Sequence, residues 1–471
     1  MQKYPNENQG KPSPLPYEEI PYQLSNEELL KIDKERLDNR IFPAAARLDR
    51  RGRIINPQQF IIADKGAAID RLVVGRTFWL ESSGTPGRIG VRVLKSRKPS
   101  VTGKRYVLVE TLSGEELVHL EDTETQIYTG PTSPNSIGVI HPGTSNPDGR
   151  DHSGQINSYG VASLVIPLLN NGIQIQQTAQ IAAYENDAAL GTATIAVLDS
   201  GIRFTTPTPR LTISSDISWD FVSDDNTPEG DPFPVDNHYG LHGTKICSII
   251  KRVAPEVGIL PVKVSNQNGQ LSLYDALCGL EFARTHGARV VNASWSFTSN
   301  GNNRPEEDFP LLLRAIRDLE ESGVVVVAAA GNRNQYTPAA NGHIGLNGAP
   351  NIYPACYSSI QDNVVTVTTI VQGATPPFSV FENFSSEFVD TGALTNGIAS
   401  TPIGEFRIPG FIGSYRGSSF ATPYVAAQIA RILSSTPGYI SKRAMLHRLR
   451  EFHEESCLSS EIRNGGSYVV V

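Results

Sequence analysis

The C-terminal two thirds of the chain alternates between short apolar runs and segments with a helical apolar stripe. Five runs are almost continuously apolar, as expected for strands that are covered on both faces. These runs are residues 194–198, 257–264, 289–294, 323–330 and 363–370. Helical patterns lie between them, for example in residues 242–253. This alternation predicts an α/β fold with a doubly wound parallel sheet in residues 161–471.

The first 160 residues have a different pattern of apolar and polar residues. Residues 1–67 are predicted to form an extended arm and a short helix, which a Ser-x-x-Glu capping box opens at Ser25. Residues 68–128 contain short alternating runs separated by Gly, Pro and Ser, which predicts a small β-rich domain, an antiparallel sheet or barrel. Residues 129–160 are dense in Gly, Pro, Ser and Asn, and we interpret them as a linker.

Composition and charge narrow the class of protein. The 471 residues carry a net charge of −7, which gives no general reason to expect a nucleic acid as partner. A basic stretch at residues 88–105 is interpreted as a solvated or self-complementary surface, with an acidic partner or a nucleic acid as the alternative. The sequence contains neither a signal-peptide pattern nor an apolar run of about 18 residues, so we predict a cytoplasmic protein without a membrane partner.

Cysteines and acidic residues suggest no metal site. The four cysteines, which are Cys247, Cys278, Cys356 and Cys457, are far apart and are predicted to be free buried thiols. No cofactor is predicted. A structural calcium ion is left open, although no acidic loop has a matching pattern, and the acidic insertion at residues 221–237 is interpreted as a solvated loop.

Polar residues stand where several of the apolar elements begin or end. Asp199 follows the first apolar run and Asn332 follows the fourth, while His242 and Ser419 stand at the starts of helical patterns. Taken one by one, these residues could be strand-end caps, turn residues or helix N-caps. Taken together, they predict a serine nucleophile, a histidine base and an orienting carboxylate, because parallel sheets collect such groups beyond the carboxyl ends of their strands. Asn332 and the backbone N–H groups at a helix start could then stabilise an oxyanion.

Four motifs carry a resemblance to a known family. They are Asp-Ser-Gly at 199–201, His-Gly-Thr at 242–244, Ala-Ala-Gly-Asn at 329–332 and Gly-Ser-Ser-x-Ala-x-Pro at 417–423. In this order they resemble the subtilisin-like serine proteases, over roughly residues 165–471. The resemblance implies that Asp199 orients His242 and that His242 serves as base and then acid. It also implies that Ser419 attacks the scissile carbonyl while Asn332 helps to hold the oxyanion.

The same resemblance implies where a substrate would bind. Residues 292–297 match the family's substrate-binding strand, residues 328–331 match the opposite wall of the primary specificity pocket, and residues 352–356 match the segment that closes it. The implied contacts are Ser294, Trp295, Ser296, Ala329, Ala330 and Gly331. Trp295 and Ser296 stand where the family commonly has leucine and glycine, and Lys245 replaces a second histidine. The substrate specificity of the family is therefore not carried over to this chain.

The prediction is a serine endopeptidase that acts on proteins or peptides inside the cell under restraint by its N-terminal region. Two alternatives are a catalytically silent peptide-binding scaffold and an esterase that uses the same triad. Residues 1–160 are either a cleaved propeptide or a permanent regulatory module that docks a protein partner.

Overall fold

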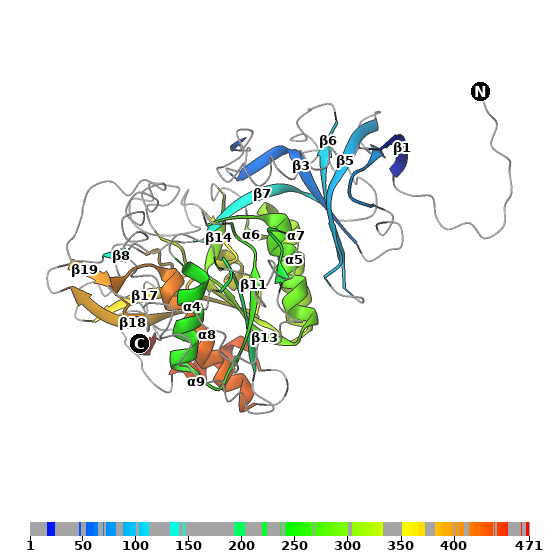
Figure 1. Cartoon of the computed structure of the whole chain (residues 1–471). Helices are drawn as coiled ribbons and strands as arrows, with labels where there is room; N and C mark the ends of the chain where they lie inside the picture. The colour runs from blue at the N-terminus through cyan, green and yellow to red at the C-terminus, as the bar shows by residue number, and fades with distance from the viewer. Residues whose placement is uncertain are drawn as a thin grey trace, which may run out of the picture. The chain divides into compact units, whose positions relative to one another are not determined.

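In the computed structural model the chain divides into two compact units (Figure 1). The first unit comprises residues 1–38, 57–98 and 104–134, and the second comprises residues 39–56, 99–103 and 135–471. The described residues are 17–23, 47–48, 53–64, 69, 72–81, 88–99, 103–112, 132–140, 145–146, 193–202, 219–223, 236, 241–266, 269–299, 304–332, 351–372, 382–398, 401–404, 406–408, 414–436, 438, 440–450, 463 and 468–470.

The first unit contains an antiparallel sheet. Its strands are, in spatial order, β1 (Tyr17–Gln23), β4 (Arg76–Glu81), β5 (Arg88–Arg97), β6 (Arg105–Thr111) and β3 (Ile54–Asp64). Apolar residues such as Phe60, Phe78 and Val107 form its core. Strands β4, β5 and β6 confirm the sheet that the sequence predicts. Strand β3 lies in the predicted arm and was missed because the polar stretch Asn56–Gln59 interrupts its apolar pattern. The helix predicted after Ser25 lies outside the described residues.

The second unit is built on a parallel sheet. Its order is β10 (Trp219–Asp220), β11 (Gly258–Lys263), β9 (Thr194–Asp199), β13 (Ala288–Ala293), β15 (Val325–Ala329), β17 (Val364–Gln372) and β18 (Thr391–Ile398). Strand β18 also pairs in parallel with β21 (Tyr468–Val470) and antiparallel with β19 (Thr401–Gly404). The chain leaves β9 toward both sides of the sheet, so the doubly wound α/β fold is confirmed. All five predicted apolar runs are strands of this sheet.

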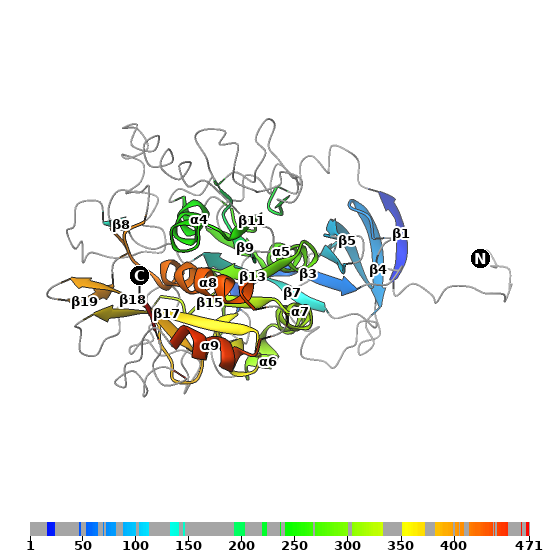
Figure 2. The same cartoon turned by 90° about the horizontal axis from the view of Figure 1, so that it is seen from below.

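Helices cover both faces of the parallel sheet (Figures 1 and 2). Helices α4 (His242–Val253), α8 (Ser418–Ser434) and α9 (Lys442–Arg450) pack in one core with Ile195 and Val197 of β9. Helices α5 (Leu273–Thr285) and α7 (Pro310–Glu321) pack together elsewhere, and α5 contacts β9, β11 and β13. A Cβ atom at Gly279 of α5 would lie 2.7 Å from Cγ1 of Val264 and 3.2 Å from Cδ2 of Leu198. Burial on both faces explains why the strands read as continuous apolar runs.

Strand β7 (Thr132–Ile140) is held by two segments of the second unit. Its residues Ile137–Val139 pair antiparallel with β12 (Gln270–Ser272). Val139 and Ile140 also lie opposite Ser296 and Trp295 of β14 (Trp295–Ser299), and β16 (Asn351–Tyr353) pairs with the rest of β14. The interpretation of residues 129–160 as a linker is therefore wrong for β7. Its Gly, Pro and Ser content hid the strand, because neighbouring strands rather than its own propensity keep it extended. Further along the same segment, β8 (Ser145–Asn146) pairs with β20 (Ser414–Tyr415).

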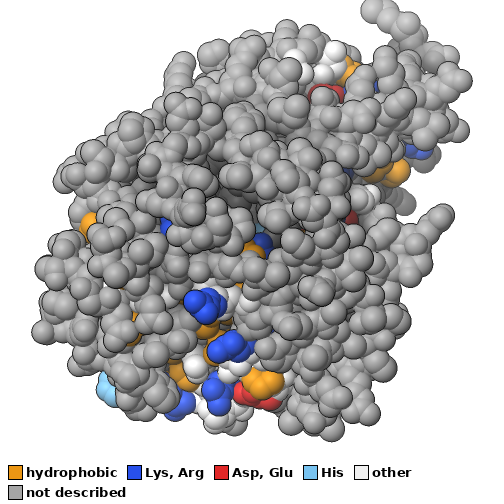
Figure 3. All heavy atoms as spheres, turned by 60° about the vertical axis from the view of Figure 1, so that its left-hand side comes forward, with side chains coloured by type: hydrophobic (Ala, Val, Ile, Leu, Met, Phe, Trp, Pro, Cys, Tyr) orange, Lys and Arg blue, Asp and Glu red, His pale blue; other side chains and the backbone are white. Residues whose placement is uncertain are grey.

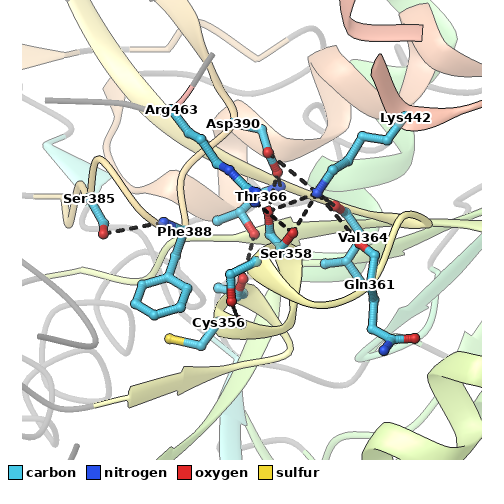
Figure 4. A network of polar contacts seen from close by, with 12 residues as sticks. Cys356, Ser358, Gln361, Val364, Thr366, Ser385, Phe388, Asp390, Lys442 and Arg463 are labelled. Carbon is cyan, nitrogen blue, oxygen red and sulfur yellow. Dashed lines mark hydrogen bonds and ion pairs between the residues drawn. The ribbon is translucent and has the colours of Figure 1, made fainter. Parts of the chain in front are cut away.

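A buried polar network ties α9 to the parallel sheet (Figure 4). Nζ of Lys442 lies 2.6 Å from the carbonyl oxygen of Ser358, 3.0 Å from that of Val364 and 3.5 Å from Oδ1 of Asp390. Arg463 donates a further hydrogen bond to the Ser358 carbonyl. Burial lowers the pKa of Lys442, and the Asp390 carboxylate opposes that shift. The ammonium is thus compensated by surrounding oxygen atoms rather than by water. Ser358 belongs to the short helix η4 (Ala355–Ser359), next to the predicted closing segment of the specificity pocket.

Charged side chains also lie at the surface of the molecule. On the face shown in Figure 3, the described Lys and Arg side chains gather toward the lower part. Arg431 and Glu256 form an exposed ion pair of 3.1 Å, and such pairs contribute little to stability. In the first unit, Arg92 pairs with Glu110 at 2.7 Å, as the self-complementary interpretation of the basic stretch expects. Among the described residues, no helix is long and apolar enough to cross a membrane.

Candidate active site

Asp199 and His242 meet where strand β9 ends and helix α4 begins. Nδ1 of His242 lies 2.9 Å from Oδ1 and 3.1 Å from Oδ2 of Asp199. Both side chains are buried. A carboxylate in this position orients the imidazole and favours the tautomer with its hydrogen on Nδ1. The other ring nitrogen, Nε2, is then the basic one.

The approach of α4 to β9 depends on Gly243. A Cβ atom at this position would lie 2.2 Å from the carbonyl oxygen of Gly201 and 3.2 Å from Oδ1 of Asp199. A side chain cannot fit there without moving the backbone. Leu241, immediately before the helix, has a φ of 48°, which is a costly conformation for a residue with a branched side chain. The turn that presents His242 to Asp199 is therefore held in place by the packing around it.

A second buried carboxylate, Asp236, holds the same helix start. It accepts hydrogen bonds from Oγ of Ser200 at 2.8 Å, from the backbone N–H of Thr244 at 2.9 Å and from Oγ1 of Thr244 at 2.6 Å. Ser200 Oγ in turn accepts the N–H of Gly243. Burial raises the pKa of Asp236, and the hydrogen bonds from Thr244 and Ser200 oppose the shift.

Sequence reasoning missed Asp236 because it ends the polar insertion that was interpreted as a solvated loop. That interpretation is wrong for Asp236, which is fully buried. Asp224, Asp225 and Glu229 of the same insertion lie outside the described residues. The partners of Asp236 come from a strand end and a helix start, so no local spacing signals the contact.

Lys245 lies one turn into α4, where the family commonly has a second histidine. Its Nζ lies 4.0 Å from the centroid of the Tyr415 ring, and its side chain is almost fully buried. Burial lowers the pKa of Lys245 to about 7, although the nearby Asp236 raises it.

Ser418 and Ser419 are the first two residues of helix α8, and both are buried. The N-cap is Gly417, with a φ of 129°, so neither serine is the N-cap of this helix. Oε1 of Glu382 accepts the N–H of Gly417 at 2.8 Å. The ring of Phe420, directly after Ser419, lies 5.4 Å from the His242 ring. The first turn of α8 is therefore placed beside His242.

Pro423 and Ser294 together fix the backbone at Ser419. Pro423 is the sixth residue of α8 and lies inside the helix. Proline has no amide hydrogen, so it cannot donate the helical hydrogen bond to the carbonyl of Ser419. Oγ of Ser294 donates to that carbonyl instead, at 2.9 Å, and itself accepts a hydrogen bond from Nδ2 of Asn292. Ser294, predicted as a substrate contact, therefore also supports the nucleophile.

Asn332 follows β15 through Gly331, whose φ is 83°. Oδ1 of Asn332 accepts the backbone N–H of Ser418 at 3.0 Å and the Ser418 hydroxyl at 3.3 Å. Its Nδ2 is buried and has no hydrogen-bond partner among the described residues. The amide oxygen thus serves helix α8, and the amide NH₂ is available as a donor at the same helix start.

The predicted substrate contacts lie on two elements. Trp295 and Ser296 begin β14, and their backbones face β7. The Trp295 side chain is fully buried against Phe297, with ring centroids 5.8 Å apart, so it is a packing residue. Ala329 ends β15, and Ala330 and Gly331 follow it. The side chain of Asn383 donates to the carbonyl of Ala330, and its backbone N–H donates to the carbonyl of Gly331. Residues 333–350, which follow this wall, lie outside the described residues.

The described cysteines are free and buried, as predicted, and Cys457 lies outside the described residues. The described residues contain no group of three or more His, Cys, Asp or Glu side chains that could hold a metal ion. The side chains described above are a hydroxyl, an imidazole, a carboxylate and an amide, and this set suits acyl transfer.

Comparison with known proteins identifies the family. The model of the subtilase family, Peptidase S8, matches residues 191–453. The chain belongs to the subtilase family. Thermitase of Thermoactinomyces vulgaris is 30% identical over 251 residues, which are 52% of this chain and 75% of thermitase. The minor extracellular protease Epr of Bacillus subtilis is also 30% identical over 251 residues, but these cover only 32% of Epr. The enzyme class is thus a subtilisin-like serine endopeptidase.

A solved structure shows the same fold. Fervidolysin from Fervidobacterium pennivorans, described as a keratinolytic enzyme related to subtilisin, aligns with a TM-score of 0.53 at 19% identity. The alignment covers 90% of this chain and 61% of fervidolysin. At this identity the similarity concerns the fold. The subtilase match begins at residue 191 and thus does not include the first unit.

Proposed function

We propose that this subtilase hydrolyses peptide bonds through Ser419, His242 and Asp199, with Asn332 as oxyanion donor. The observation that carries the proposal is the buried 2.9 Å contact between His242 Nδ1 and Asp199 Oδ1 beside the first turn of α8. A serine hydroxyl is a weak nucleophile unless a base takes its proton, and this contact prepares such a base.

The proposed reaction has two stages. Ser419 Oγ attacks the scissile carbonyl while Nε2 of His242 takes the hydroxyl proton, and His242 then gives that proton to the leaving amine. Water hydrolyses the resulting acyl-enzyme by the same route. Asp199 stabilises the imidazolium, while Nδ2 of Asn332 and the backbone N–H of Ser419 donate to the oxyanion.

We further propose that β7 restrains the enzyme by occupying the path of the substrate. The family resemblance assigns residues 292–297 to substrate binding, and β7 pairs with that edge through Val139 and Ile140. Because β7 is antiparallel to β14, its chain direction leads toward Ser294, whose hydroxyl contacts the carbonyl of Ser419. A substrate that adds a strand to β14 would need the same backbone groups. The intracellular location stays a prediction from the sequence.

The triad is tested with a fluorophosphonate probe, which forms a bond to an activated serine. Wild-type protein should be labelled, and the Ser419→Ala variant should not. Ser418→Ala is the matched control, because this neighbouring hydroxyl is assigned no role in attack. Failure of folded wild-type protein to label, with β7 either intact or cleaved, would refute the nucleophile and leave the silent scaffold. Labelling with hydrolysis of esters but not of peptides would favour the esterase.

The restraint is tested separately with Val139→Pro and Val139→Thr. Proline removes the N–H of a residue that pairs with both β12 and β14, whereas threonine keeps it and remains β-branched. Val139→Pro should hydrolyse an added peptide faster than Val139→Thr. Equal rates in the two variants, with normal probe labelling, would refute the restraint and leave the protease proposal intact.

A further inference from the structure

A short N-terminal segment packs with the peptidase unit although residues 57–131 separate it from β7 along the chain. Residues 39–56 group with the second unit, whereas residues 57–98 group with the first. The described part of this segment contains the short strand β2 (Arg47–Leu48), which pairs with Ile54 and Ile55 of β3. Arg53, Ile55 and Asn56 are buried.

Arg53 is the most unusual member of this segment, because only 1% of its surface is exposed. NH1 of Arg53 donates to the carbonyl oxygen of Asp308 at 2.5 Å, and its guanidinium carbon lies 5.5 Å from the centroid of the Phe309 ring. Its positive charge also lowers the pKa of Tyr357, although burial dominates and raises that pKa overall. A buried arginine is retained only where hydrogen bonds and aromatic faces compensate for lost water.

Asp308 connects this arginine to the proposed substrate-binding edge. It ends the short helix α6 (Pro305–Asp308), and its Oδ2 accepts hydrogen bonds from Tyr353 OH at 2.7 Å, from Nδ2 of Asn351 at 3.1 Å and from the hydroxyl of Ser299. Ser299 ends β14, while Asn351 and Tyr353 belong to β16. Arg53 therefore binds the backbone of a residue whose side chain is held by β14 and β16.

We propose that Arg53 anchors the N-terminal region permanently, so that this region stays bound to the peptidase unit after the chain is cut between them. This inference goes beyond the proposed function and does not require catalysis. Withdrawal of the segment would expose the buried guanidinium and leave the Asp308 carbonyl without that donor, as well as uncovering the aromatic group that contains Phe309. Breaking a buried interaction of this kind is strongly unfavourable. The N-terminal region is accordingly a subunit-like part of the enzyme rather than a leaving propeptide.

The test uses the full chain carrying Ser419→Ala and a recognition site for a sequence-specific protease inserted between residues 113 and 131. This stretch lies outside the described residues and precedes β7. After complete cleavage, the N-terminal fragment should co-elute with the rest of the chain in size-exclusion chromatography. Arg53→Ala should weaken the association by about 10²–10³-fold. Arg53→Lys should weaken it as well, because lysine lacks the planar fork of donors.

Arg92→Ala is the matched control. It removes an arginine from the same fragment, but one whose ion pair with Glu110 is partly exposed. The effect of this change on association should be no more than about fivefold. Release of the wild-type fragment on cleavage would overturn the proposal. An equal effect of Arg53→Ala and Arg92→Ala would overturn it too. Circular dichroism of each uncut variant shows whether it has folded. If Arg53→Ala does not fold, Arg53→Lys and the wild-type fragment still decide the matter.

Discussion

Replacing Ser294 with alanine should weaken both the fold and the activity through the carbonyl of Ser419. The change removes the hydroxyl that donates to this carbonyl, where Pro423 cannot supply the helical hydrogen bond. It also removes the acceptor used by Nδ2 of Asn292. Loss of a donor to a buried carbonyl costs about 1–3 kcal/mol, and the Asn292 hydrogen bond contributes about 1 kcal/mol more. Ser294→Ala should therefore lower the free energy of unfolding by about 2–4 kcal/mol.

The second change, Pro423→Ala, makes the prediction specific. Alanine at 423 restores the N–H that a continuous helix would donate to the Ser419 carbonyl. In the double variant, about 1–3 kcal/mol of the loss should return, while the contribution of Asn292 should stay lost. Urea unfolding of the four proteins, each carrying Ser419→Ala to prevent self-digestion, gives the coupling energy.

Activity supplies the second measurement, now with Ser419 intact. Ser294→Ala should reduce kcat because the turn that carries the nucleophile loses its support, and Pro423→Ala should restore part of it. Additive effects of the two substitutions on stability, with a coupling energy near zero, would refute the compensation between Pro423 and Ser294. A Ser294→Ala variant as stable as the wild type would refute the role of the hydroxyl itself.

Three further changes test other parts of the site. Asn332→Asp keeps the acceptor for the Ser418 N–H but lacks the NH₂ donor, so kcat should fall by about 10²–10³-fold in a peptide assay. Lys442→Met leaves Asp390 without its buried ammonium and should lower the free energy of unfolding by about 3–5 kcal/mol in urea. Because the folded state lowers the pKa of Lys245 from 10.5 to about 7, unfolding takes up a proton between these values, and stability should rise with pH. Lys245→Met should remove up to about 1.4 kcal/mol per pH unit of that rise.

The parallel sheet was predictable because its strands carry their own signal. Burial on both faces requires apolar side chains at successive positions, and residues 325–329 satisfy this requirement without reference to any partner. Strand β3 and strand β7 behave differently. The polar interruption in β3 and the Ser, Pro and Gly content of β7 give weak local preferences, and hydrogen bonds to neighbouring strands decide their conformation. A single sequence does not contain that information.

The site shows the same division. Asp199, His242, Asn332 and Ser419 could be proposed because each stands at an element end within a motif. The residues that position these four side chains could not be predicted from the sequence. Glu382, which accepts the N–H of Gly417, comes from a different part of the chain, and nothing in its neighbours marks it as a partner of α8. Nor does the sequence around Pro423 indicate that the Ser294 hydroxyl replaces the hydrogen bond that proline cannot donate, because that contact joins residues far apart in the chain.

Strand β14 is contacted by β7 and by Asp308, and it directly follows Ser294. Its first two residues pair with β7, and its last residue, Ser299, donates to Asp308, whose carbonyl binds Arg53. Directly before the strand, Ser294 supports the carbonyl of Ser419. Two N-terminal segments therefore act on the same strand, one by direct pairing and the other through Asp308. If β7 leaves while Arg53 stays, β14 loses a neighbour along its edge but keeps its support at the far end. The proposed anchor would thus allow the substrate path to open without loosening the backbone that holds the nucleophile.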